Sequence, residues 1–156
     1  MDIKKLNKED LEKEIDSIHK NLVNQKLNCA ERTFLTVKSF LETNIPSEAV
    51  TLLTGFGGGI GGTHESVCGA VTGGVCALGL VFGRRKPAEE SSEKAYAVAR
   101  DFICKFRSRF GTEVCGELIG DLLRVNKFDS DERRERCFNY TLNAIKLCTD
   151  IIIKNS

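Results

Sequence analysis

The feature that most constrains the fold of this chain is a glycine run at residues 55–62, where six of eight residues are glycine. Glycine loses much conformational freedom in a regular helix, and it adopts backbone angles that other residues avoid. We therefore expect a turn here. Such a turn exposes backbone N–H groups and lets the backbone approach an anionic group closely.

Most of the remaining sequence has helical periodicity. Apolar residues at spacings of three and four predict an amphipathic helix at about residues 7–24, and Asn28 is a candidate cap for a second helix that begins near Cys29. Further helices are expected at about 46–54, 66–82, 92–110, 113–124 and 131–153. The sequence thus predicts an all-α, single-domain bundle over residues 1–156, with about six or seven helices and a glycine-rich turn before a buried central helix.

The predicted central helix, residues 66–82, is uncharged and holds four glycines. It is shorter than the ~20 residues that a membrane span needs, and no second apolar segment could pair with it. We therefore expect a core helix, not an integral membrane protein. Neighbouring helices would approach it over Gly69 and Gly73.

Charge and cysteine content narrow the classes of function. The formal net charge of +1 gives no basic surface for nucleic acid. Residues 1–5 contain no apolar segment of a secretory signal, so a cytoplasmic location is expected, where structural disulfides are disfavoured. Seven cysteines are more than packing requires, and an odd number excludes a fully paired set of internal disulfides. Metal ligation or thiol redox chemistry is favoured.

The cysteines fall into two groups. Four lie on different predicted helices, and a bundle could bring them to one point: Cys29, Cys68, Cys115 and Cys137. Three lie among apolar neighbours and are interpreted as buried packing residues: Cys76, Cys104 and Cys148. Four thiolates suit an iron–sulfur cluster or a tetrahedral zinc ion, although the sequence has no Cys-x-x-Cys pair.

Other residues near the glycine run carry weaker signals. Cys68 is expected in the first turn of its helix, where free N–H groups and the helix dipole favour a thiolate. His64 could be a ligand or a proton carrier, but a solvated side chain is the simpler interpretation. His19 is interpreted as a surface residue. The run lacks the Gly-Lys-Ser/Thr ending of a phosphate-binding loop and no strand precedes it, so a nucleotide site has weak support.

The order of these landmarks resembles the C_GCAxxG_C_C family of proteins described as redox-active. The matching segments are Asn28-Cys29-Ala30, Gly57-Gly58-Gly59, Cys68-Gly69-Ala70-Val71-Thr72-Gly73, Leu78-Gly79-Leu80, Phe106, Phe110-Gly111, Cys115-Gly116-Glu117-Leu118-Ile119-Gly120 and Cys137. The family label has Gly-Cys-Ala where this chain has Cys-Gly-Ala, so the match is aligned on the cysteine. The resemblance implies redox activity at four cysteines, Cys29, Cys68, Cys115 and Cys137, in proteins often linked to transporters.

The leading hypothesis is a redox module with one site beside the glycine turn. An iron–sulfur cluster is favoured: the same four cysteines would be its ligands, next to backbone N–H groups of Gly57, Gly58, Gly59 and Gly69. In a dithiol version Cys68 is the attacking thiolate, and Cys115 or Cys29 resolves the product, so that Cys68 and Cys115 are candidate catalytic residues.

The alternative is a binding module without electron chemistry, stabilised by zinc or using its glycine loop, and associated with a membrane transporter. The partners expected from either hypothesis are a redox protein or a transporter component. A homodimer is a further option.

Overall fold

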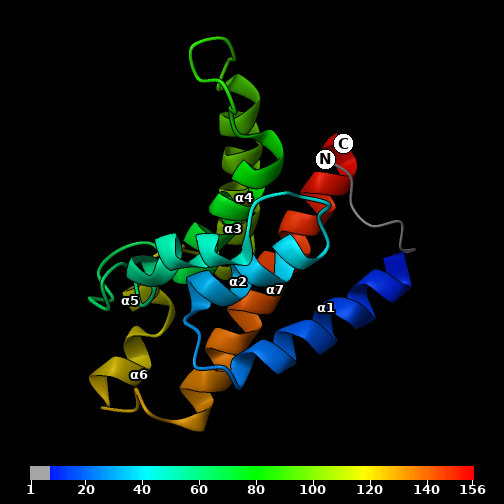
Figure 1. The fold of residues 1–156 in the computed structure, drawn as a ribbon. Coiled ribbons are helices and arrows are strands. Elements are labelled where there is room, and N and C mark those ends of the chain that lie inside the picture. Colours follow the sequence, from blue (N-terminus) through cyan, green and yellow to red (C-terminus); the bar gives the residue numbers. More distant parts are fainter. Residues whose placement is uncertain (1–7) are drawn as a thin grey trace.

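A computed structural model describes residues 8–156 as an assembly of helices (Figure 1). Within these residues the β-structure is limited to one isolated bridge. The eight helices are α1 (Lys8–Val23), α2 (Cys29–Ser39), the 3₁₀ helix η1 (Ser47–Phe56), α3 (Gly69–Phe82), α4 (Glu93–Phe110), α5 (Cys115–Leu118), α6 (Gly120–Arg124) and α7 (Asp131–Asn155). The predicted all-α class is confirmed. Residues 1–5, where no secretory signal is expected, lie outside the described range.

The core forms where α2, α3 and α7 pack against one another, with α1 and α4 on either side (Figure 1). Close packing of α2 on α3 depends on Gly73. A Cβ atom at this position would lie 2.3 Å from the carbonyl oxygen of Ala30 and 2.9 Å from its Cα. A side chain is therefore excluded, and the two backbones come closer than larger residues would allow.

The start of α2 follows the predicted capping pattern. The side chain of Asn28 accepts hydrogen bonds from the backbone N–H groups of Ala30 and Glu31, while the Glu31 carboxylate accepts one from the Asn28 N–H at 2.8 Å. This reciprocal arrangement is a capping box, which satisfies N–H groups that a helix start leaves unpaired. Cys29 is consequently fixed as the first residue of α2.

Three boundaries differ from the prediction. The short helix after Pro46 is 3₁₀, and the expected helix at residues 113–124 divides at Ile119 into α5 and α6. The central helix begins at Gly69, so Cys68 is its N-cap and not a residue of its first turn. None of the helices in the described part of the chain has the length and apolar character needed to cross a membrane.

Two side chains have the opposite exposure to that expected. His19 is fully buried, with Nε2 2.8 Å from Oγ1 of Thr141 and its ring 4.3 Å from that of Phe138, measured between centroids. It faces inward because α1 places it on the same side as the buried residue Ile15, four positions earlier. Cys104, interpreted as a packing residue, is exposed on α4.

Burial of His19 predicts that the protein loses stability as the pH falls from about 6.5 to about 4. Burial, reinforced by the charge of Arg32, lowers the pKa of His19 from 6.5 to about 4. The unfolded chain therefore binds a proton in this interval that the folded chain does not, which costs up to about 3 kcal/mol of unfolding free energy. Urea unfolding across this interval measures the effect.

The His19→Gln variant is the control, because it retains a polar side chain but does not titrate. The difference in unfolding free energy between wild type and variant is expected to shrink with falling pH. A difference that stays constant from pH 7 to pH 4 contradicts the prediction.

Candidate thiol redox site

A short antiparallel pairing joins the segment before α3 to the segment before α5. Val67 and Val114 form the isolated β-bridge. On either side of it, the Cys68 N–H donates to the Glu113 carbonyl at 2.7 Å and the Cys115 N–H donates to the Ser66 carbonyl at 2.9 Å. These bonds hold Val67 and Cys68 in a non-helical conformation, which is why α3 begins later than its apolar sequence suggests. They also bring the segment that carries Cys68 against the segment that carries Cys115.

Cys29 reaches the same place from α2. A Cβ atom on Gly69 would lie 2.7 Å from the Cys29 sulfur, so only glycine leaves room for that sulfur against the first residue of α3. Gly69 directly follows Cys68. The Cys-Gly pair at residues 68 and 69 therefore lets the thiol of Cys29 approach the segment that carries Cys68.

The glycine run forms a tightly wound turn beside these cysteines. Gly58 and Gly59 both have positive φ angles, in the left-handed region that glycine adopts most easily. A Cβ atom on Gly59 would lie 2.8 Å from the Cβ of Cys115, and one on Gly57 would lie 2.6 Å from the side chain of Asn28. The contact with a cofactor that is expected for four glycines stays a prediction: Gly57, Gly58, Gly59 and Gly69. In the structure Gly57, Gly59 and Gly69 make room for residues at the site.

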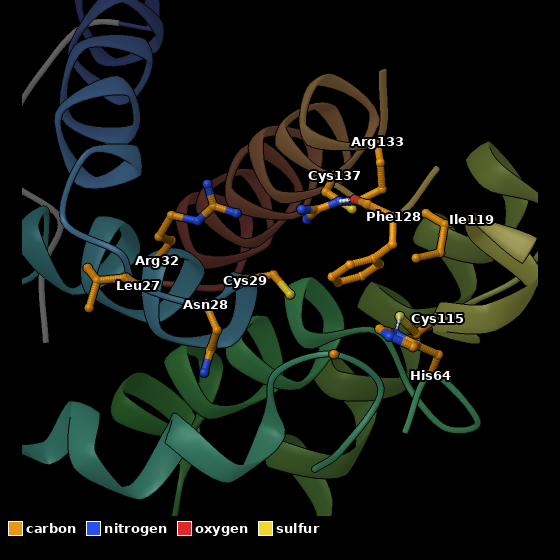
Figure 2. A pocket seen from close by; sticks show the side chains of 11 residues that line it. Leu27, Asn28, Cys29, Arg32, His64, Cys115, Ile119, Phe128, Arg133 and Cys137 are labelled. Carbon is orange, nitrogen blue, oxygen red and sulfur yellow. Dashed lines mark hydrogen bonds between the residues drawn. The ribbon is translucent and has the colours of Figure 1, made fainter. Parts of the chain in front are cut away.

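Three of the four predicted thiols open into one cavity of about 210 Å³. Cys29, Cys115 and Cys137 line it, and in Figure 2 they surround the aromatic ring of Phe128. Cys68 is not among the lining residues and is buried. The cavity lies where the start of α2, the glycine turn, α5 and the first turns of α7 meet. All seven cysteines, which lie within residues 8–156, are free thiols.

Neighbouring cysteines affect the ionisation of Cys68, Cys115 and Cys137. Burial raises the pKa of Cys68 and of Cys137, and it raises the pKa of Cys115 to about 12. After burial, the negative charge of Cys29 makes the largest upward contribution in each of the three. Cys29 is thus the cysteine whose charge acts most strongly on the other three.

These pKa shifts correct the expected behaviour of Cys68. The sequence predicted that its place at a helix start would favour the thiolate. The structure shows a buried N-cap side chain whose pKa is raised because desolvation disfavours the charged form. The raised pKa disfavours the thiolate form of Cys68. It does not test whether Cys68 is the attacking thiol.

The four thiols have the donor chemistry of a metal site. A tetrahedral zinc ion holds each sulfur at about 2.3 Å, so four ligands must converge on one point. Among the described residues, no three His, Cys, Asp or Glu side chains come together closely enough to hold a metal ion. The thiols suit zinc or an iron–sulfur cluster in chemistry and in number, but their placement in this structure does not fit a bound ion.

Four further residues at the cavity were missed or undervalued from the sequence. His64 was interpreted as solvated, but its Nδ1 lies 3.5 Å from the Cys115 sulfur. The other three are Phe128, Arg32 and Arg133. Helical spacing held a signal for the two arginines: Arg32 follows Cys29 by three residues, and Arg133 precedes Cys137 by four, so each shares a helix face with a cysteine.

The fold and the cavity define a helical protein with four cysteines gathered beside a glycine-rich turn. The chain belongs to the family described as "Putative redox-active protein (C_GCAxxG_C_C)", whose sequence pattern matches residues 27–151. This match confirms the resemblance seen in the sequence. A relative from Archaeoglobus fulgidus, described as "Uncharacterized protein", is 28% identical over 133 residues, which cover 81% of this chain and 85% of the relative. No solved structure was found to match.

Proposed function

We propose that this protein carries out thiol–disulfide exchange, with Cys29 and Cys68 as the pair that cycles between dithiol and disulfide. One observation supports this pair above all: the Cys29 sulfur lies against Gly69, the residue next to Cys68. Cys29 also lines the cavity, so a disulfide substrate can reach it, whereas Cys68 lies behind it. Cys29 is therefore the attacking thiol in this proposal and Cys68 the resolving thiol, the reverse of the order expected from the sequence.

The exchange has two steps. The Cys29 thiolate attacks one sulfur of a substrate disulfide, the substrate S–S bond breaks, and one substrate thiolate leaves. Cys68 then attacks the Cys29 sulfur of the mixed disulfide and displaces the second substrate thiolate. Each released thiolate takes up a proton that a protein thiol has lost. Overall, two protein thiols are oxidised to one disulfide, and one substrate disulfide is reduced to two thiols.

The electrostatics of Cys68 suit the second step. Burial is the main cause of its raised pKa, and the charge of Cys29 is the second cause. Once Cys29 is part of a mixed disulfide it carries no charge, so this second contribution disappears. Ionisation of Cys68 becomes easier after the first step than before it.

Counting thiols in dithiothreitol buffers of defined redox ratio tests the proposed exchange. Free thiols are alkylated, and intact-mass spectrometry counts them. We expect two of the seven thiols to be lost in oxidising buffer and restored in reducing buffer. If all seven remain alkylatable under oxidising conditions, the protein has no exchanging pair and the proposal is wrong.

An iron–sulfur protein is a second candidate, because three thiols from separate parts of the chain line one cavity and a fourth, Cys68, is buried next to Gly69, which the Cys29 sulfur approaches. The four thiolates would be its ligands, and such a cluster would supply one-electron transfer. Thiol exchange is placed first because the Cys29 sulfur already lies against Gly69, the residue next to Cys68. Iron and acid-labile sulfide, measured per chain on protein purified without oxygen, separate the two. Stoichiometric values of both would favour the cluster.

A further inference from the structure

Two arginines line the thiol cavity and have no carboxylate partner among the described residues. Arg32 and Arg133 both line it, near Cys29 and Cys137 respectively (Figure 2). Among the residues that the structure describes, neither forms an ion pair, and the buried Nε of Arg32 has no hydrogen-bond partner. Arg133 donates from Nε to the Phe128 carbonyl at 2.7 Å, and its guanidinium lies 4.4 Å from the centre of that ring.

Arg136 is half-buried, as Arg32 and Arg133 are, and it pairs with Asp121 and Glu132. The remaining arginines in the described part of the chain are exposed, some with an ion pair and some without, so water solvates them. Leaving a partly buried guanidinium without an anion is unfavourable, because it loses water without gaining a counter-charge. Among the half-buried arginines that the structure describes, the two at the cavity are therefore the ones without an ion pair, and this requires an explanation.

Carboxylates near the cavity do not neutralise the two arginines. Glu31, next to Arg32 in the sequence, is occupied by the Asn28 N–H and by the hydroxyl of Thr54. A neighbouring hollow of about 470 Å³ shares both arginines and Cys137 with the cavity. The lining of this second hollow also contains three further charged residues, Lys26, Arg134 and Glu135. The lining of both hollows carries an excess of positive charge.

We propose that Arg32 and Arg133 form an anion-binding subsite, and that the disulfide reduced at this site is a small molecule bearing carboxylates. This inference rests on the proposed exchange at Cys29, which the arginines adjoin. A guanidinium binds a carboxylate through two parallel hydrogen bonds, so the pair can hold the two ends of a dicarboxylate or orient one end. A substrate of this kind would bring its S–S bond to Cys29.

The arginines also act on the thiols themselves. Burial raises the pKa of Cys137, and the charges of Arg133 and Arg32 oppose that rise. If stabilising thiolates were their whole role, their loss would slow exchange with every disulfide equally. A subsite for anions instead makes the loss depend on the charge of the substrate. Substrate charge is therefore the variable to change.

Three disulfides of similar length but different charge provide this test: 3,3′-dithiodipropionate, bis(2-hydroxyethyl) disulfide and cystamine, which are dianionic, neutral and dicationic. We expect wild type to react about tenfold faster with the dianion than with the neutral compound. In the Arg32→Gln, Arg133→Gln double variant this preference is expected to disappear. Replacement of both residues by lysine retains the charge and should retain much of the preference. Arg100→Gln is the control, because Arg100 is exposed on α4 and lines neither hollow.

Suberate provides a readout that does not depend on exchange, because it is the sulfur-free analogue of dithiodipropionate. It should raise the unfolding temperature of wild type and not that of the double glutamine variant. Exchange without charge preference, or an equal slowing with all three disulfides, overturns the anion subsite and leaves the proposed function intact. Absence of exchange together with suberate binding that requires the arginines overturns the proposed function and supports the subsite. Absence of suberate binding to wild type counts against the subsite.

Discussion

Replacing Cys29 with serine is expected to slow disulfide exchange by at least about a hundredfold, because a serine hydroxyl does not ionise near neutral pH and cannot replace the thiolate. Cys29 lies at the cavity and exerts the largest effect of any cysteine on the pKa values of Cys68, Cys115 and Cys137. Its loss should remove the entry point for the substrate. Stopped-flow or coupled assays with 3,3′-dithiodipropionate measure the rate.

Cys104→Ser is the matched control for this substitution. Its thiol is exposed on α4 and does not line the cavity, so the variant should exchange at the wild-type rate. An equal loss of rate in both variants, or full activity of Cys29→Ser, contradicts the assignment of Cys29 as the attacking thiol.

Gly73→Ala is expected to lower the unfolding free energy by about 3 kcal/mol, since the added methyl group meets backbone atoms that cannot move independently. The new Cβ would lie 2.3 Å from the Ala30 carbonyl oxygen, at the contact between α2 and α3. To relieve this overlap the two helices must separate, and the core that they share loses packing. Urea denaturation at pH 7 measures the change.

Gly79→Ala tests the same helix without the overlap. Gly79 is exposed, and a Cβ atom there meets nothing within 4 Å. Because alanine is the better helix former, this variant should gain about 0.5–1 kcal/mol. Destabilisation of similar size in both variants would show that the cost arises from helix propensity and not from the α2–α3 contact.

Helix positions were largely predictable because the relevant forces are local. Apolar spacing, the Asn28 cap and the glycine run sufficed to place most helices to within a few residues. Errors arose where long-range contacts override local preference. Residues 66–68 stay outside α3 because they hydrogen-bond to residues 113–115, a pairing that neither segment reveals alone. Likewise, the spacing of apolar residues along α1 does not show that His19 contacts Thr141 of α7.

The grouping of four cysteines was predictable in part, from their distribution over helices and from the family resemblance. What the sequence did not provide was the order of exposure within the group, with Cys29 at the cavity and Cys68 behind it. Exposure depends on how the glycine turn and α7 cover each thiol. The arginines were overlooked because a charged residue on a helix usually faces solvent. Their significance appears only when the partners of each guanidinium are known.

Mapping the disulfide in oxidised wild-type protein tests the central proposal most directly. The protein is oxidised in dithiothreitol buffer, trapped in acid, digested without reduction and analysed by mass spectrometry for cross-linked peptides. A single intramolecular cross-link between Cys29 and Cys68, absent after reduction, is the predicted result. A cross-link that leaves Cys29 free, or an oxidised sample without any internal cross-link, would contradict the proposed exchange at this pair.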